Sequence, residues 1–208
     1  MVEPIRLMTE TYTYADLLDW PEDARWELID GVAYCMTLAP SRQHQEILGE
    51  LYLQFGIFLR NAPCRVYLAP FDVRLPKPHE NAMTASTVVQ PDLAVICERA
   101  QLDQRGAVGG PTLVIEILSP YTAKKDRHLK RRVYEQAGVR EYWIISPGEK
   151  TVEVYHLQGP EQYDAGTIYQ YNDHVPVSVL PGLTIDLQQV FIEEGEDGPL
   201  LLRESAEM

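Results

Sequence analysis

The sequence feature that most constrains the fold is an apolar run from Leu113 to Leu118, in which Glu116 is the only polar residue. A short apolar run rich in β-branched residues is typical of a buried strand. Because side chains alternate along a strand, Glu116 is expected on the face opposite to Ile115 and Ile117. A carboxylate is costly to bury alone, so Glu116 must meet a cation, accept strong hydrogen bonds or become protonated.

The residues after this run predict a strand-helix-strand unit. A helix is expected from Ala123 to Ala137, closed by Gly138, and a further strand covers residues 140–146. Two strands joined by a helix are typical of a parallel pair in an α/β protein. The predicted fold class is therefore α/β with a mixed sheet, flanking helices and additional antiparallel strands.

Other elements follow from hydrophobic periodicity and turn residues. Apolar residues at helical spacing predict a helix that begins after Ser41, as N-cap, and ends at Asn61. Asp30-Gly31 predicts the turn of a hairpin over residues 25–38. The remaining predictions are a short helix at 14–20, strands at 65–76 (interrupted near Pro70), 92–97, 112–118, 151–157, 167–171 and 175–180, and loops at 77–90 and 98–111.

Length and composition fit one domain with an acidic end. A chain of 208 residues with 45% apolar residues can bury one sizeable core, so residues 1–192 are expected to form a single domain and 193–208 a partly disordered tail. The sequence shows neither a signal peptide nor an apolar run of membrane length, which predicts a cytoplasmic protein. Cys35, Cys64 and Cys97 are odd in number and widely spaced, which predicts reduced core cysteines.

Asp92 is the natural companion of Glu116, because it begins the preceding predicted strand directly after Pro91. If the two strands are neighbours, the two carboxylates converge and repel each other unless a cation lies between them. Oxygen ligands of this type suit Mg²⁺ or Mn²⁺. Two alternatives stay open: Asp92 could bond its local backbone, and Glu116 could pair with an arginine in a buried ion pair.

The helix after Glu116 carries Asp126, Lys130 and Tyr134 at intervals of four residues, roughly on one face. If this helix folds back over the sheet, the Lys130 ammonium can approach the acids. It could then orient or help deprotonate a water and stabilise charge at phosphorus. The alternative is an ordinary surface pair between Asp126 and Lys130.

The distribution of charge allows only a local polyanion contact. A net charge of -13 argues against a general nucleic-acid binder. Residues 124–132, however, hold six of the eighteen Lys and Arg residues. This cluster is either a solvated helix face or a phosphate-binding patch, and we expect phosphate contacts from Lys124, Lys125, Arg127 and Arg131.

Several segments together resemble the bacterial putative restriction endonuclease domain, a branch of the PD-(D/E)XK nuclease superfamily. The resemblance covers nearly the whole chain. Its segments are Glu27 to Gly31, His44, Gln90-Pro91-Asp92, Ile115 to Pro120, Asp126 with Lys130 and Tyr134, Gly138 to Trp143, and Leu180 to Leu183.

The resemblance implies a restriction-endonuclease-like core and a metal-dependent endonuclease, with DNA as the expected substrate. Asp92 and Glu116 would be metal ligands, with the backbone carbonyl of Ile117 as a third. The superfamily pattern has Lys two residues after the Glu, where this chain has Leu118, and Lys130 would take over the function of that lysine. A homodimer is also implied. The alternative is a nuclease-fold protein with little or no turnover that binds nucleic acid or protein.

Three further residues are weaker candidates for the site. Asp72 begins a core strand and is the next candidate ligand. His44 could be a ligand or a substrate contact, although a structural histidine is a common alternative. Glu27 could be an outlying acid of the cleft or a residue that packs the hairpin. Tyr142 and Trp143 are expected in the core, because their strand is otherwise apolar.

Overall fold

The computed structural model describes residues 11–21, 24–36, 39–120, 122–159 and 162–191. The predicted acidic tail, 193–208, lies outside the described residues. None of the helices within the described ranges is long and apolar enough to cross a membrane.

A six-stranded mixed sheet forms the centre of the molecule. Its strand order is β12-β11-β10-β9-β6-β3. The bounds are β3 Arg65–Leu68, β6 Leu93–Ile96, β9 Leu113–Ile117, β10 Glu141–Ser146, β11 Thr151–His156 and β12 Thr167–Gln170. The neighbours β9 and β10 run parallel, and the other pairs are antiparallel. The predicted fold class and the strand-helix-strand unit are therefore confirmed.

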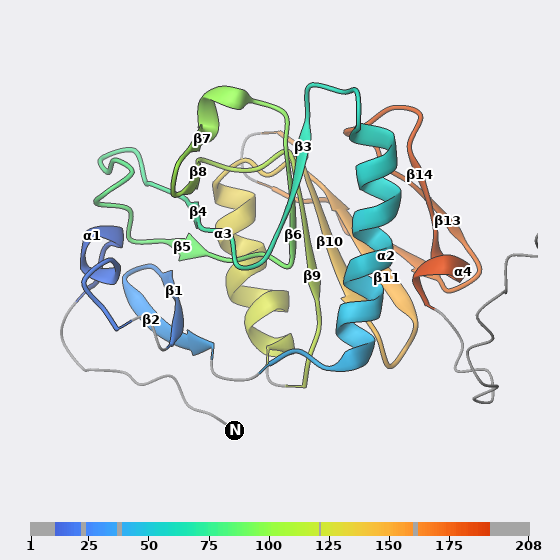
Figure 1. Cartoon of the computed structure of the whole chain (residues 1–208), viewed down its shortest axis with the longest axis horizontal. Helices are drawn as coiled ribbons and strands as arrows, with labels where there is room; N and C mark the ends of the chain where they lie inside the picture. The colour runs from blue at the N-terminus through green and yellow to red at the C-terminus, as the bar shows by residue number, and fades with distance from the viewer. Residues whose placement is uncertain (1–10, 22–23, 37–38, 121, 160–161, 192–208) are drawn as a thin grey trace, which may run out of the picture.

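Helices cover both faces of this sheet, and Figure 1 shows its strands between α2 and α3. Helix α2, Arg42–Leu59, is capped at its N-terminus by Ser41, as predicted; the Ser41 hydroxyl accepts a hydrogen bond from the backbone N–H of His44 at 3.2 Å. Its apolar side packs with Ile115 and Ile117, whereas Val114 packs with residues of α3, Arg131–Gln136. The expected alternation of faces along β9 is thus confirmed.

The helix predicted over Ala123 to Ala137 is not uniform. Residues Lys125–Lys130 form a π-helix, which continues directly into α3. Wide turns of this kind occur often at functional sites. A hydrophobic pattern cannot distinguish them from an α-helix, because the inward-facing residues recur at similar spacing.

A second six-stranded sheet, of short strands, lies beside the first (Figure 1). Its order is β2-β1-β5-β4-β8-β7. The bounds are β1 Arg25–Ile29, β2 Val32–Met36, β4 Val73–Arg74, β5 Val88–Val89, β7 Leu102–Asp103 and β8 Gly106–Val108. The hairpin turn at Asp30-Gly31 is confirmed, since both residues have positive φ angles of 51° and 77°. Strands β5, β7 and β8 lie where loops were predicted, because two or three residues give no readable period.

Short elements complete the fold at its two ends. Helix α1, Tyr14–Leu17, confirms the predicted short helix. The strand predicted at 175–180 is reduced to β13, His174–Pro176, which pairs with the unpredicted β14, Thr184–Asp186. Helix α4, Leu187–Val190, was also not predicted; it follows β14 and is capped by the Asp186 side chain. A 3₁₀ turn at Arg99–Gln101 precedes β7.

The prediction of reduced cysteines is wrong for two of the three. Cys64 and Cys97 form a disulfide, and Cys35 is free. The register pairs Arg65 with Ile96, so the next residues outward on β3 and β6 stand opposite each other. The two cysteines are 33 residues apart, so their pairing could not be predicted from their spacing in the sequence. It follows from the register of β3 and β6.

Candidate catalytic site

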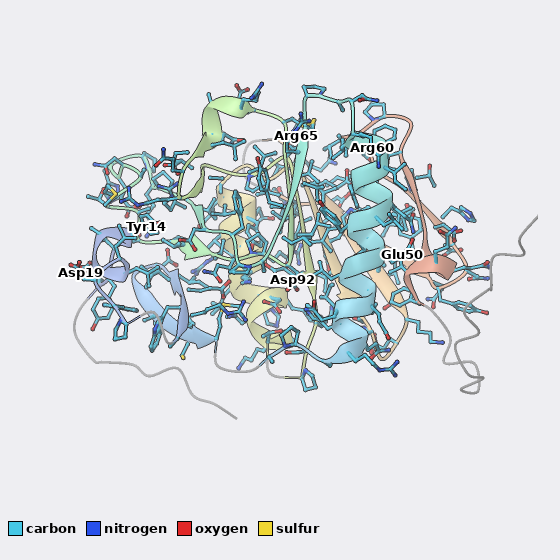
Figure 2. All side chains as sticks on the ribbon, in the orientation of Figure 1. Tyr14, Asp19, Glu50, Arg60, Arg65 and Asp92 are labelled. Atoms are coloured by element: carbon cyan, nitrogen blue, oxygen red, sulfur yellow. A yellow bond between two sulfur atoms is a disulfide. The ribbon has the colours of Figure 1, made fainter. Side chains whose placement is uncertain are left out.

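Asp92 and Glu116 face each other across two adjoining strands. Leu93 pairs with Ile115 in the antiparallel ladder of β6 and β9, so Asp92 and Glu116 occupy the next opposed positions. The backbone N–H of Ile117 donates to Asp92 Oδ2 at 2.7 Å. Asp92 therefore bonds the backbone of the neighbouring strand rather than its own segment. In Figure 2, Asp92 lies near the middle of the molecule, between α3 and α2 in this view.

Glu116 is 3% exposed and meets a lysine rather than an arginine. Lys130 Nζ donates to Glu116 Oε1 at 2.9 Å, and the Tyr134 hydroxyl donates to the same oxygen at 2.6 Å. No hydrogen bond from another described residue ends on Glu116 Oε2. The helix face that the sequence predicted is therefore directed at the acid on β9.

Lys130 bridges three acids. Its Nζ lies 2.7 Å from Glu27 Oε1, 2.9 Å from Glu116 Oε1 and 3.8 Å from Asp126 Oδ1. The lysine and Asp126 are each 2% exposed, so the alternative of a surface pair is wrong. Asp126 Oδ1 is buried and accepts no hydrogen bond from the described residues.

Glu27 joins the second sheet to the site and is fully buried. Its Oε2 accepts a hydrogen bond from Lys125 Nζ at 2.6 Å, and its Oε1 accepts one from the backbone N–H of Gln90 at 2.9 Å. Glu27 thus holds both the lysine of the site and the residue that precedes Pro91-Asp92. Its backbone pairs with Tyr34 in the β1-β2 hairpin, whereas the hydrogen bonds of its side chain are with residues around the site.

His44 and Asp72 lie at different distances from the acid pair. His44 Nε2 lies 3.2 Å from Asp92 Oδ1, and its buried Nδ1 has no hydrogen-bond partner among the described residues. Asp72 accepts hydrogen bonds from Tyr14 and from the side-chain amide of Gln90, at 3.1 and 2.9 Å. Among the described residues, the side chain of Asp72 is linked to the site through Gln90. That bridging role of Gln90 was not predicted, and its position before Pro91-Asp92 was the only signal.

The acids of the site are unequal in proton affinity. Burial and repulsion from Asp126, Asp92 and Glu27 raise the pKa of Glu116 to about 8, despite the attraction of Lys130. Burial alone would also raise the pKa of Glu27, but Lys130 and Lys125 outweigh it and lower that pKa to about 2. Burial would lower the pKa of Lys130, yet Glu116, Glu27 and Asp126 together raise it well above its ordinary value. Lys130 is therefore charged in the folded protein.

The donor set of the site is compatible with a hard cation. In the part of the chain that the structure describes, no three His, Cys, Asp or Glu side chains are arranged to hold a metal ion. Mg²⁺ commonly uses only one or two carboxylates and keeps several waters. The opposed carboxylates of Asp92 and Glu116 meet that requirement. Besides the cost of its burial, the charge of Glu116 is opposed by the nearby carboxylates of Asp126, Asp92 and Glu27, and a cation beside them would relieve this repulsion.

Most of the predicted basic cluster is already engaged within the molecule. Lys125 pairs with Glu27, Arg127 pairs with Glu153, and the Arg131 guanidinium lies 4.3 Å from the centre of the Tyr155 ring. Lys124 is exposed and forms no ion pair with a described residue. Of the four predicted phosphate contacts, Lys124 alone is presented to solvent without such a partner.

This mixed sheet, with a β9-helix-β10 unit and an acid on each of two adjoining strands, defines a protein of the restriction-endonuclease-like class. The chain belongs to the Uma2 family, described as putative restriction endonuclease, whose model matches residues 14–188. Membership of this family supports nuclease, and hence hydrolase, activity in general.

Two individual proteins are similar to the chain. A putative nuclease of DUF820 from Anabaena variabilis, known from a crystal structure, shares the fold with a TM-score of 0.68 and 22% identity. The match covers 86% of this chain and 97% of that one. An uncharacterized protein from Synechocystis sp. is 26% identical over 144 residues, which are 68% of this chain and 72% of the relative.

Removing the Lys130 ammonium should destabilise the fold strongly. Lys130→Met leaves Glu27 and Glu116 buried without their shared cation, so we expect a loss of about 3–5 kcal/mol in the free energy of unfolding, measured with urea. Lys124→Met is the matched control on the exposed side and should stay within about 0.5 kcal/mol of the wild type. Equal, small effects of the two substitutions would contradict the buried bridge.

Glu116 should also make stability depend on pH. Its folded pKa of about 8 lies above the ordinary 4.5, so its contribution is fully present below about pH 4.5 and is lost as the pH rises through 8. Glu116→Gln does not titrate. In EDTA, the stability of the wild type relative to this variant should therefore fall across that window. A difference that stays constant with pH would show that the pKa of Glu116 is not raised.

Proposed function

We propose that the protein is a metal-dependent endonuclease that hydrolyses phosphodiester bonds, with DNA as its substrate. The observation that carries the proposal is the opposition of Asp92 and Glu116 at the ends of β6 and β9, with the Lys130 ammonium on Glu116. One or two carboxylates suit a Mg²⁺ ion that activates water, and a nearby ammonium can stabilise the charge that develops at phosphorus.

Asp92, Glu116 and the backbone carbonyl of Ile117 would hold Mg²⁺ or Mn²⁺. The bound ion would lower the pKa of a water and neutralise charge on phosphate oxygens. The protein's own residues position these ligands. His44 and the Ile117 N–H hold the two oxygens of Asp92, while Tyr134 orients Glu116 by donating to Oε1.

Lys130 would stabilise the negative charge that develops at phosphorus and orient the attacking water. Its second partner, Glu27, keeps the ammonium charged and fixed in place, so Glu27 acts as a positioning residue. Because Lys130 reaches the acids from the helix, it takes over the task of the lysine that Leu118 replaces.

Lys124 would make the first contact with the phosphates of the substrate. Three basic residues near it would join by exchanging a partner within the protein for a phosphate. Lys125, Arg127 and Arg131 would contact phosphates by leaving Glu27, Glu153 and Tyr155. The rest of the chain is strongly acidic and would repel nucleic acid, so phosphate contacts would be confined to the vicinity of the site. Because they are made by Lys and Arg, these contacts would weaken as the salt concentration rises.

The second candidate is a binding module that kept the nuclease fold without turnover. The observation that favours it is the enclosure of Lys130 by Glu27, Glu116 and Asp126, together with the pairing of the basic cluster inside the molecule. Such a protein would bind nucleic acid or protein through the same face and hydrolyse nothing.

Cleavage of plasmid and single-stranded DNA, with Mg²⁺ or Mn²⁺, distinguishes the two candidates. We expect the wild type to cut, and Asp92→Asn and Glu116→Gln to lose about a hundredfold or more of the rate, since each removes one of the two acidic ligands. Lys130→Arg keeps the charge and should lose less than Lys130→Met. Asp19→Asn, an exposed acid on the far side of the second sheet (Figure 2), is the matched control and should cut normally.

The pattern of outcomes decides between the candidates. Cutting that survives in both acid variants would come from a contaminant and would reject the endonuclease. No cutting by the wild type, with Mn²⁺ bound by the wild type but not by Asp92→Asn in calorimetry, would favour the binding module instead.

A further inference from the structure

A second group of hydrogen-bonded polar side chains lies apart from the acid pair. His156 is the last residue of β11, and its ring nitrogen Nδ1 lies 3.2 Å from Asp164 Oδ2. The other ring nitrogen, Nε2, lies 2.9 Å from Ser178 Oγ. A carboxylate, an imidazole and a hydroxyl joined in this order are the groups that activate a serine as a nucleophile. These three residues are called the serine cluster below.

The serine cluster lies on the opposite face of the central sheet from Glu116. Because side chains alternate along a strand, His156 shares the face of Val154, which packs in the core with residues of α2. Glu116 shares the face of Val114, which packs with residues of α3. Figure 1 shows the β13-β14 hairpin, whose turn carries Ser178, at the right of the view and away from the second sheet. The cluster is therefore not part of the candidate catalytic site.

Backbone hydrogen bonds hold Asp164 against His156. Asp164 Oδ1 accepts from the backbone N–H of His156 at 3.1 Å and from that of Gly166 at 3.0 Å. The backbone N–H of Asp164 in turn donates to the His156 carbonyl oxygen at 2.9 Å. These bonds leave Oδ2 beside the ring, so the carboxylate fixes the orientation of the imidazole.

The charge of Asp164 determines which ring nitrogen of His156 carries the proton. Burial opposes the ionisation of Asp164, but hydrogen bonds from His156 and Gly166 outweigh it and lower the pKa of the carboxyl. An ionised carboxylate can only accept, so in the neutral imidazole the proton lies on Nδ1. Nε2 is then an acceptor, and the Ser178 hydroxyl donates to it. In this state a histidine can take the proton of a serine.

A short turn presents Ser178 to solvent. Ser178 is exposed and lies between β13 and β14, in a turn closed by a hydrogen bond of 3.0 Å from the Leu180 N–H to the Val177 carbonyl oxygen. The next residue, Val179, donates its N–H to Oε2 of the buried Glu141 at 3.0 Å. Glu141 thereby attaches the turn to β10, the neighbour of the strand that carries the histidine.

We propose that Ser178 is the nucleophile of a second site, which transfers acyl groups from small esters. His156 is its general base, and Asp164 is a positioning residue that holds the imidazole in the required tautomer. Ser178 Oγ attacks the carbonyl carbon of the ester while His156 Nε2 takes the hydroxyl proton. The bond between that carbon and the leaving oxygen then breaks, and the imidazolium gives the proton to the leaving alcohol. A water repeats both steps on the acyl-serine and releases the carboxylic acid.

The surroundings of Ser178 restrict the substrate. In many acyl-transfer sites the backbone N–H after the nucleophile stabilises the oxyanion, but here the Val179 N–H is donated to Glu141. A good leaving group reduces the need for that stabilisation, so aryl esters are favoured over alkyl esters. Because the serine lies at the surface and a long acyl chain needs an apolar pocket, the acyl group is a short one such as acetyl.

A fluorophosphonate probe tests the nucleophile, because Ser178 Oγ would displace fluoride from its phosphorus and stay labelled. In EDTA, which keeps the result independent of the proposed nuclease, peptide mass spectrometry should find the label on Ser178 of the wild type and none at this position in Ser178→Ala. His156→Gln removes the base and should lower the labelling rate about a hundredfold or more. Thr184→Ala, which removes an exposed hydroxyl from β14 of the same hairpin, is the matched control and should be labelled like the wild type.

Asp164→Asn tests the positioning role. Asparagine keeps an oxygen for the backbone N–H groups of His156 and Gly166 but turns its amide N–H₂ toward Nδ1. The ring proton then lies on Nε2, which can no longer accept the proton of Ser178. With p-nitrophenyl acetate as the substrate, kcat should fall about tenfold or more while KM stays unchanged, because Asp164 does not touch the ester. Urea unfolding shows that each variant is folded.

The wild type alone can reject the proposal, whatever the variants do. A wild type that carries no label at Ser178 would overturn it, as would a labelling rate that His156→Gln leaves unchanged. An Asp164→Asn variant that hydrolyses the ester like the wild type would show that the serine cluster is a structural hydrogen-bond network and not an acyl-transfer site.

Discussion

The structure depends on one buried cation, the ammonium of Lys130, which lies between Glu27 and Glu116. Three parts of the chain meet at this point: the β1-β2 hairpin of the second sheet, the central strand β9, and the π-helix that covers it. A buried charge loses its hydration, and only close partners restore that free energy. Removing Lys130, Glu27 or Glu116 would therefore leave a buried charged group without a partner that stabilises it. The same contact that joins the two sheets also sets the geometry of the site.

The excess of acids around Lys130 explains the chemistry that we assign. Glu27 lies beside two ammonium groups, those of Lys130 and Lys125, and their attraction lowers its pKa. Glu116 lies beside the Lys130 ammonium alone, and its pKa rises because burial and the neighbouring acids outweigh that attraction. A divalent cation beside Asp92 and Glu116 would relieve this repulsion and lower the pKa of Glu116. The lysine would then remain anchored by Glu27. In this account the Glu27 contact is what allows Lys130 to serve a site that also binds a metal.

The sequence predicted the parts of this arrangement that depend on local pattern. Glu116 was identified because it interrupts an apolar run, and Lys130 because it follows at helical spacing on a helix that must return over the sheet. The Asp30-Gly31 turn and the Ser41 cap carry their own residue signals. The contacts of Glu27, the bridging role of Gln90 and the disulfide between Cys64 and Cys97 could not be predicted, since each depends on register between segments distant in sequence. The basic cluster was recognised, but its partners Glu153 and Tyr155 lie on β11, which no local pattern connects to the helix.

The central claim is that Asp92 and Glu116 form one cation site with Lys130 beside it. A crystal structure with Mn²⁺, located by its anomalous scattering, tests this claim most directly. The account predicts one ion at about 2.0–2.3 Å from a carboxylate oxygen of Asp92 and one of Glu116, with Lys130 still bound to Glu27. An ion bound elsewhere, or a site in which Lys130 keeps Glu116 and excludes Mn²⁺ at saturating concentration, would contradict it.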